Sequence, residues 1–171
     1  MAQDLVNNDL HVNGSLSAKS WTVPANVIGN TQVKTGDPID TTKLEHRHCH
    51  DYEQASDTEV VAESRMIHSV RGVTGNVVSI RCAIETVATG ADRTITVDLH
   101  KSTGAGAFAT ILTATIGYTN GSAERTVTNG TIATPALVVG DILKLVVTDA
   151  GAAGAQAQGL VITVEIDEDA S

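Results

Sequence analysis

Three histidines alternate within five residues of this chain. His46, His48 and His50 are separated by Arg47 and Cys49. In an extended strand alternate residues share a face, so the three imidazoles point one way and the other two side chains point the opposite way. Imidazole is a ligand for zinc, nickel, copper and iron. One chain offers too few well-spaced ligands for a closed site, whereas three chains on an axis would supply six imidazoles from His46 and His48, enough for an octahedral site. The spacing therefore predicts a transition-metal site at His46 and His48.

The same run of residues has other interpretations that the sequence leaves open. It can be a solvated polar strand whose histidines form local hydrogen bonds. It can be a tetrahedral zinc site that includes Cys49. It can also be a pH-sensitive contact, because protonation near pH 6 would bring like charges together on one face.

The second cysteine has a different setting. Cys82 lies on the apolar side of an alternating run with Val78, Ile80 and Ile84. A nucleophilic thiol needs a neighbouring base and an electropositive, partly open environment, and nothing in the sequence places one there. Cys82 is therefore expected to be a small buried apolar side chain.

The C-terminal run from Glu165 to Asp169 is strongly acidic. It lacks the glycine turn and the fixed ligand spacing of a calcium-binding loop. The pattern therefore favours a solvated acidic tail over a cation site.

Strands are the elements expected to position these residues. Apolar and polar residues alternate over residues 78–85, 94–100, 143–147 and 160–166, which is typical of half-buried antiparallel strands. Glycine and asparagine mark turns between these runs. The pattern predicts seven or eight short strands after residue 64, with one helical turn over residues 57–65. The expected fold is all-β: an antiparallel, jelly-roll-like sandwich.

The first part of the chain has a different pattern. A short hairpin is predicted over residues 10–16, with Asn13-Gly14 at its bend. Residues 35–44 contain too few apolar side chains to fold alone, so this segment is either flexible or ordered by packing on other subunits. The predicted organisation is an N-terminal arm or oligomerisation segment over residues 1–55 and a sandwich domain over residues 56–171.

Composition excludes several classes of function. The chain has 171 residues and a net charge of −9, so it lacks the basic surface that nucleic-acid binding needs. It has no apolar run of the roughly 20 residues that cross a membrane, and no secretory signal is expected at its start. Hydrophobic residues make up 42% but aromatic residues only 2%, which disfavours stacking on sugars or single strands.

Several segments resemble virion proteins of tailed bacteriophages. The resemblance rests on DLHVNGSLSAKSWTVPANVIGNTQV and DPIDTTKLEHRH near the N-terminus. It continues in TITVDLHKS, GTIATPALVVGDILKLVVT and GLVITVEIDED, which are similar to jelly-roll domains of head-decoration, head-fibre and collar proteins. The His46-x-His48 pair also resembles histidine pairs on the threefold axes of trimeric phage spikes and fibres.

The resemblance implies a structural virion protein and not an enzyme. It would be a capsid decoration (cement) protein or a short head fibre, made in the host cytoplasm and located in the virion. Its expected partners are its own copies, as a homotrimer, and the major capsid protein or another virion protein, with no nucleic acid, membrane or required cofactor. The alternative is a collar or tail-fibre module that recognises a host surface.

Overall fold

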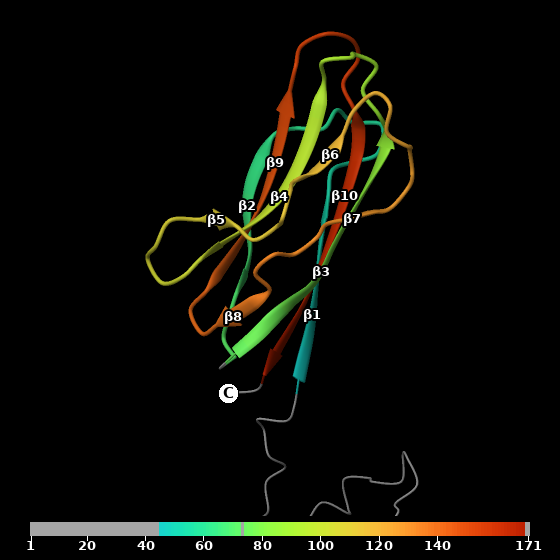
Figure 1. The fold of residues 1–171 in the computed structure, drawn as a ribbon. Coiled ribbons are helices and arrows are strands. Elements are labelled where there is room, and N and C mark those ends of the chain that lie inside the picture. The colour runs from blue at the N-terminus through green and yellow to red at the C-terminus, as the bar shows by residue number, and fades with distance from the viewer. Residues whose placement is uncertain (1–44, 73, 170–171) are drawn as a thin grey trace, which may run out of the picture. The chain divides into compact units, whose positions relative to one another are not determined.

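Two antiparallel sheets pack face to face in the computed structural model, which describes residues 45–72 and 74–169 (Figure 1). Sheet A contains β1 (Glu45–Glu53), β10 (Gln158–Asp169) and β3 (Thr74–Thr86), in that order, with β7 (Thr128–Asn129) and β8 (Ala136–Val138) both on β3. Sheet B contains β2 (Glu63–Ser69), β9 (Ile142–Ala150) and β4 (Thr94–Ser102), with β5 (Ala109–Thr110) and β6 (Ile116–Tyr118) both on β4. The predicted all-β sandwich is confirmed. The described residues include no helix, and hence none that is long and apolar enough to cross a membrane.

The alternating runs in the sequence form the strands that build the core. Ile95, Val97 and Leu99 point inward from β4, and Leu143 and Leu145 point inward from β9; all five are at most 1% exposed. Sheet A contributes a matching inner face of buried side chains: Ile80, Cys82, Ile84, Ile162, Val164 and Ile166. Each fully buried Leu or Ile stabilises the fold by about 1.5–3 kcal/mol relative to exposure. The core therefore lies between the two sheets and holds them together.

The alternation predicted for β3 is wrong at its N-terminal end. Val78 is 42% exposed, whereas its neighbour Val77 is buried. The register between β3 and β10 shifts here, because Glu165 pairs with Ser79 but Ile166 pairs with Val77. Val78 is therefore an extra residue on its strand, and a bulge of this kind reverses the faces that follow it.

Two further predictions are wrong. Residues 57–65 do not form a helical turn; Asp57 has a φ of 57° in a tight turn, and the chain then extends into β2. The acidic run is not a solvated tail, because β10 continues to Asp169 and Glu168 is only 5% exposed. The carboxylates of this run are part of a strand because side chains on neighbouring strands pair with them: His68 with Glu168, Arg81 with Glu165 and Arg47 with Asp167.

Residues 45–53, which the sequence pattern grouped with the N-terminal arm, form an edge strand of the sandwich. β1 pairs with β10 along its whole length, from Glu45 opposite Asp169 to Glu53 opposite Val161. The strand begins where β10 ends, at the lower end of the sandwich in Figure 1. The predicted hairpin over residues 10–16 lies outside the described residues, and the division into residues 1–55 and 56–171 stays a prediction.

Candidate functional site

The histidines of β1 meet a fourth histidine from the other sheet. His48 and His50 lie opposite Ile166 and Val164 of β10, so they face the interior as strand alternation predicts. Their rings are stacked with centroids 6.3 Å apart. His68 of β2 approaches both, with its ring centroid 5.2 Å from that of His48 and 4.9 Å from that of His50. The cluster therefore connects the edges of sheets A and B.

A chain of polar contacts extends from this cluster into the interior. The Nε2 atom of His50 lies 3.0 Å from Nδ1 of His68, and Nε2 of His68 contacts a carboxylate oxygen of Glu168. The other carboxylate oxygen of Glu168 accepts hydrogen bonds from the backbone N–H groups of Gly72, at 2.8 Å, and Arg71, at 3.2 Å. This buried carboxylate is therefore satisfied by three groups from sheet B and the loop that follows β2.

Burial, hydrogen bonds and neighbouring charges shift two pKa values in this cluster. Burial lowers the pKa of His50, and repulsion from His68 and His48 lowers it further. Burial acts to raise the pKa of Glu168, but the hydrogen bonds from Gly72, His68 and Arg71 outweigh it and lower that pKa. The arrangement therefore favours an ionised Glu168 and a neutral His50.

The metal site at His46 and His48 stays a prediction, because it needs three chains. Within one chain, the described residues contain no group of three or more His, Cys, Asp or Glu side chains arranged to hold a metal ion. His46 is exposed, whereas His48 contacts the rings of His50 and His68. Cys49 is exposed and points to the opposite face of β1, so it does not join the histidines of its own chain.

Sequence reasoning missed His68 and Glu168. They are distant from the histidine run in sequence, and only the pairing of β1 with β10 and the packing of β2 over it bring them together. A signal for Glu168 was present, because it continues the alternation of Ile162, Val164 and Ile166. The acidic character of the run concealed that alternation.

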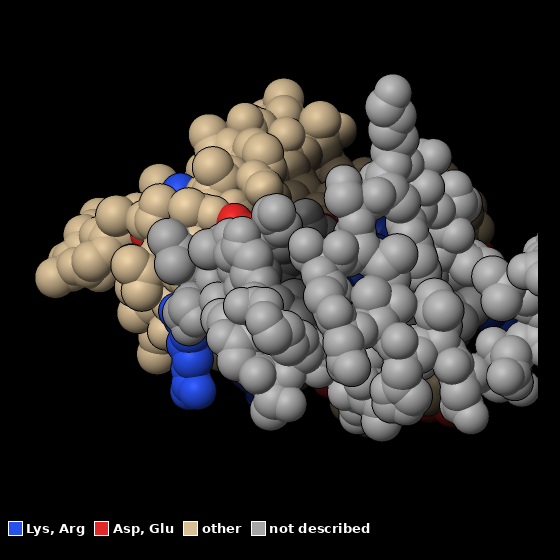
Figure 2. All heavy atoms as spheres, turned by 90° about the horizontal axis from the view of Figure 1, so that it is seen from below, with Lys and Arg blue, Asp and Glu red and all other residues tan. Residues whose placement is uncertain are grey.

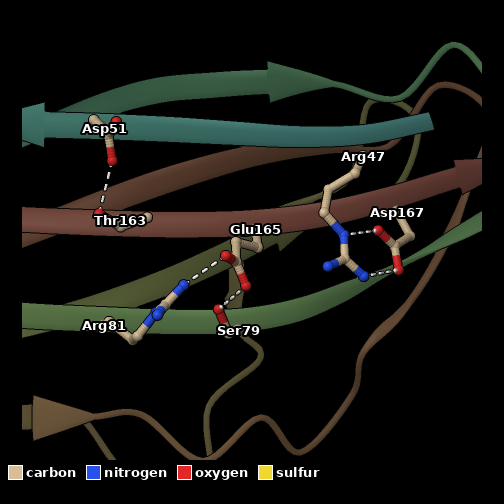
Figure 3. A network of polar contacts seen from close by, with 7 residues as sticks. All are labelled: Arg47, Asp51, Ser79, Arg81, Thr163, Glu165 and Asp167. Carbon is tan, nitrogen blue, oxygen red and sulfur yellow. Dashed lines mark hydrogen bonds and ion pairs between the residues drawn. The ribbon is translucent and has the colours of Figure 1, made fainter.

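The outer face of sheet A carries a second set of polar contacts, which crosses three strands (Figure 3). Arg47 of β1 donates hydrogen bonds to Asp167 of β10 at 2.8 and 3.2 Å. Glu165 of β10 accepts hydrogen bonds from Arg81, at 2.5 Å, and from Ser79, at 2.8 Å. The hydrogen bond from Arg47 lowers the pKa of Asp167. These charges are therefore paired within the sheet.

A shallow hollow of about 520 Å³ opens near the other end of sheet A. Its lining includes Gln54, Glu85, Arg125 and Val161. Glu85 already accepts hydrogen bonds from the Ser56 hydroxyl, at 2.6 Å, and from a backbone N–H, and both lower its pKa.

Figure 2 views the molecule from the opposite end, where the visible described surface is mainly uncharged with separate charged side chains. Neither the hollow nor the described surface visible in Figure 2 is a charged surface of a single sign.

The thiol of Cys82 is buried, as predicted. It is 1% exposed, and burial raises its pKa to about 12. A thiol in this setting remains protonated and contributes to packing.

Comparison with known proteins assigns no family. No family model matches the chain, and no curated protein matches it. Among solved structures, a capsid asymmetric unit of cyanophage Pam1 is 14% identical, with 85% of this chain and 99% of that chain covered and a TM-score of 0.43. A chain in a structure of the Gx strain of infectious bursal disease virus is also 14% identical, with 87% of this chain and 42% of that chain covered and a TM-score of 0.37. At these values the likeness assigns no function to this chain.

Proposed function

We propose that this chain is a structural component of a virus particle, as a capsid decoration (cement) protein or a short head fibre. The proposal rests on the resemblance of its segments to virion proteins of tailed bacteriophages. The observation that carries it is the two-sheet antiparallel sandwich, which is the architecture that the resemblance predicts. Ion pairs between Arg47 and Asp167 and between Arg81 and Glu165 cross the outer face of its sheet A.

Shell binding would require no chemistry from the protein. Contacts spread over neighbouring capsid subunits bind the assembled shell more tightly than free subunits, and mass action then stabilises the shell. The aromatic side chains in the described part are placed where they do not offer one large side chain that could dominate binding to a partner. Tyr52 and Tyr118 are buried, and Phe108 lies under the ammonium group of Lys144, 4.2 Å from it. Recognition would then depend on backbone and small side chains.

Particles with and without the chain test this proposal. Particles made without the chain should lose shell stability on heating, and the purified protein should bind them and restore it. Immunogold labelling of intact particles with antibody against the sandwich should place the chain on the head. A deletion that leaves shell melting unchanged, together with no binding by the purified protein, would exclude the cement role. Label on the tail or collar would favour the alternative module that recognises a host surface.

A further inference from the structure

Two Asn-Gly pairs in the described part of the chain lie in contrasting surroundings. The described residues contain three asparagines, and two of them, Asn120 and Asn129, precede a glycine. The third, Asn76, precedes the β-branched Val77. An asparagine loses its side-chain amide when the next backbone nitrogen attacks it, and glycine hinders this attack least because it has no side chain. Whether the reaction occurs in a folded protein depends on how firmly that nitrogen is held.

The first pair lies in an exposed turn. Asn120 belongs to the loop that joins β6 to β7 (Figure 1). The backbone N–H of Ser122 donates to the carbonyl of Thr119 at 3.0 Å, which closes the turn around Asn120 and Gly121. The N–H of Gly121 contacts the Thr119 hydroxyl at 3.4 Å, which is longer than a usual N–H···O hydrogen bond. A Cβ at Gly121 would meet no atom closer than 3.9 Å, so this peptide group has room to rotate.

The second pair is held on both sides. Asn129 lies in β7, where it pairs with Arg81 of β3. The N–H of Gly130 donates to the carbonyl of Ile80 at 2.9 Å. A Cβ at Gly130 would lie 2.6 Å from the Cγ2 atom of Ile80 and 3.0 Å from the Cδ1 atom of Ile116. The nitrogen of Gly130 therefore cannot turn toward the side chain of Asn129 unless β7 leaves β3.

We propose that Asn120 is a site of spontaneous deamidation in the folded protein, and that Asn129 is protected from it. The nitrogen of Gly121 gives its proton to hydroxide and attacks the Cγ atom of Asn120. A C–N bond forms and closes a succinimide ring, while the bond from Cγ to Nδ2 breaks and Nδ2 takes a proton from water and leaves as ammonia. A water molecule then opens the ring at either carbonyl, which gives aspartate or isoaspartate with no change of oxidation state.

The reaction changes the charge of the loop between β6 and β7. Each event replaces a neutral amide with a carboxylate, in a chain whose net charge is already −9. The same loop holds Glu124, which accepts a hydrogen bond from the backbone N–H of Val87 at 3.2 Å. Isoaspartate also passes the main chain through the former side chain and so lengthens the turn. The inference concerns the chemistry of this loop and is independent of the proposed role in a virion.

Peptide mapping by mass spectrometry tests the proposal. During incubation of the purified full-length chain at mildly alkaline pH, the aspartate and isoaspartate forms should accumulate at Asn120 at least about tenfold faster than at Asn129, because strand pairing must open before Asn129 reacts. In concentrated urea the two rates should become similar, since unfolding releases the N–H of Gly130. Equal rates in the folded protein, or an Asn120 that reacts only in urea, would overturn the proposal.

Two glycine variants test the attacking nitrogen. Gly121→Ala places a methyl group beside this nitrogen and should slow the reaction at Asn120 several-fold. Gly117→Ala is the matched control, because a Cβ there meets no atom within 4 Å and Gly117 does not precede an asparagine's attacking nitrogen, so the rate should stay unchanged. Melting temperatures equal to that of the wild type confirm that both variants fold. A rate that Gly121→Ala does not alter would overturn the attack by the nitrogen of Gly121.

Discussion

The Nε2 atom of His50 lies 3.0 Å from the Nδ1 atom of His68, and this contact joins the edge strands of the two sheets. One of the two nitrogens must carry a proton to form the hydrogen bond, and the other must accept it. If both rings are fully protonated, neither nitrogen accepts and two positive charges face each other. The contact between the sheets is therefore compatible with at most one charged ring.

We predict that the free energy of unfolding falls as pH falls below about 6.5. The folded-state pKa of His50 lies below its ordinary value of 6.5, because of burial and the neighbouring histidines. The unfolded chain then binds more protons than the folded chain in the interval between the two pKa values, so acid favours unfolding. Urea unfolding between pH 8 and pH 5 should show this loss, and His50→Gln should reduce its slope.

His46→Gln is the matched control for this experiment, since it removes an exposed histidine from the same strand. A slope that is the same in wild type and in His50→Gln would show that the contact between His50 and His68 does not couple protonation to folding.

A second prediction concerns the buried carboxylate of Glu168. Glu168→Ala should cost about 3 kcal/mol, because it leaves the buried N–H of Gly72 without an acceptor and removes the partner of His68. Glu165→Gln is the control, because Glu165 pairs with Arg81 on the outer face of sheet A and its side chain is 24% exposed, against 6% for Glu168, and it should cost less than about 1 kcal/mol. Urea unfolding at pH 7 measures both. Equal costs would show that burial does not distinguish these carboxylates.

Periodicity predicted the sandwich and the shared face of His48 and His50, but not the partners that complete the cluster, for a physical reason. In β4 and β9 the alternation of apolar and polar residues matches the alternation of buried and less buried side chains, because one face of each strand lies in the core. The bulge at Val78 depends on its pairing with β10, which local sequence does not encode. The same is true of His68 and Glu168, whose interaction is created by the pairing of β1 with β10 and the packing of the two sheets. Polar residues that are buried together are therefore the ones that local patterns misplace.

A third prediction concerns Asp141, which has a fully buried side chain. Its carboxylate accepts a hydrogen bond from the N–H of Val138 at 3.0 Å and lies 3.5 Å from the ammonium group of Lys101. Lys101→Met leaves this charge without its cation and should cost about 3 kcal/mol. The double variant Lys101→Met with Asp141→Asn should cost less than Lys101→Met alone, because an amide needs no cation. Thermal melting of the set decides this, and a double variant less stable than Lys101→Met would contradict it.

A fourth prediction separates backbone strain from steric contact at two glycines. Gly151 has a φ of 86°, and a Cβ there would lie 2.3 Å from the carbonyl oxygen of Asp92. Gly104 has a φ of 59° with no atom within 4 Å of the same position. Gly104→Ala should therefore cost only the left-handed strain, about 1 kcal/mol. Gly151→Ala should cost at least about 2 kcal/mol more, because the loop after β9 must also move. Similar melting temperatures for the two variants would contradict this difference.

A fifth prediction concerns the transition-metal site at His46 and His48. The predicted site needs three chains around an axis, so that six imidazoles surround one ion. A chelator should therefore lower both the solution mass, from three chains, and the melting temperature, and metal analysis should find one ion for every three chains. His46→Ala should act like the chelator, and it is the cleaner variant because His48 also contacts His68 inside the sandwich. A mass and a melting temperature that both treatments leave unchanged would exclude the site.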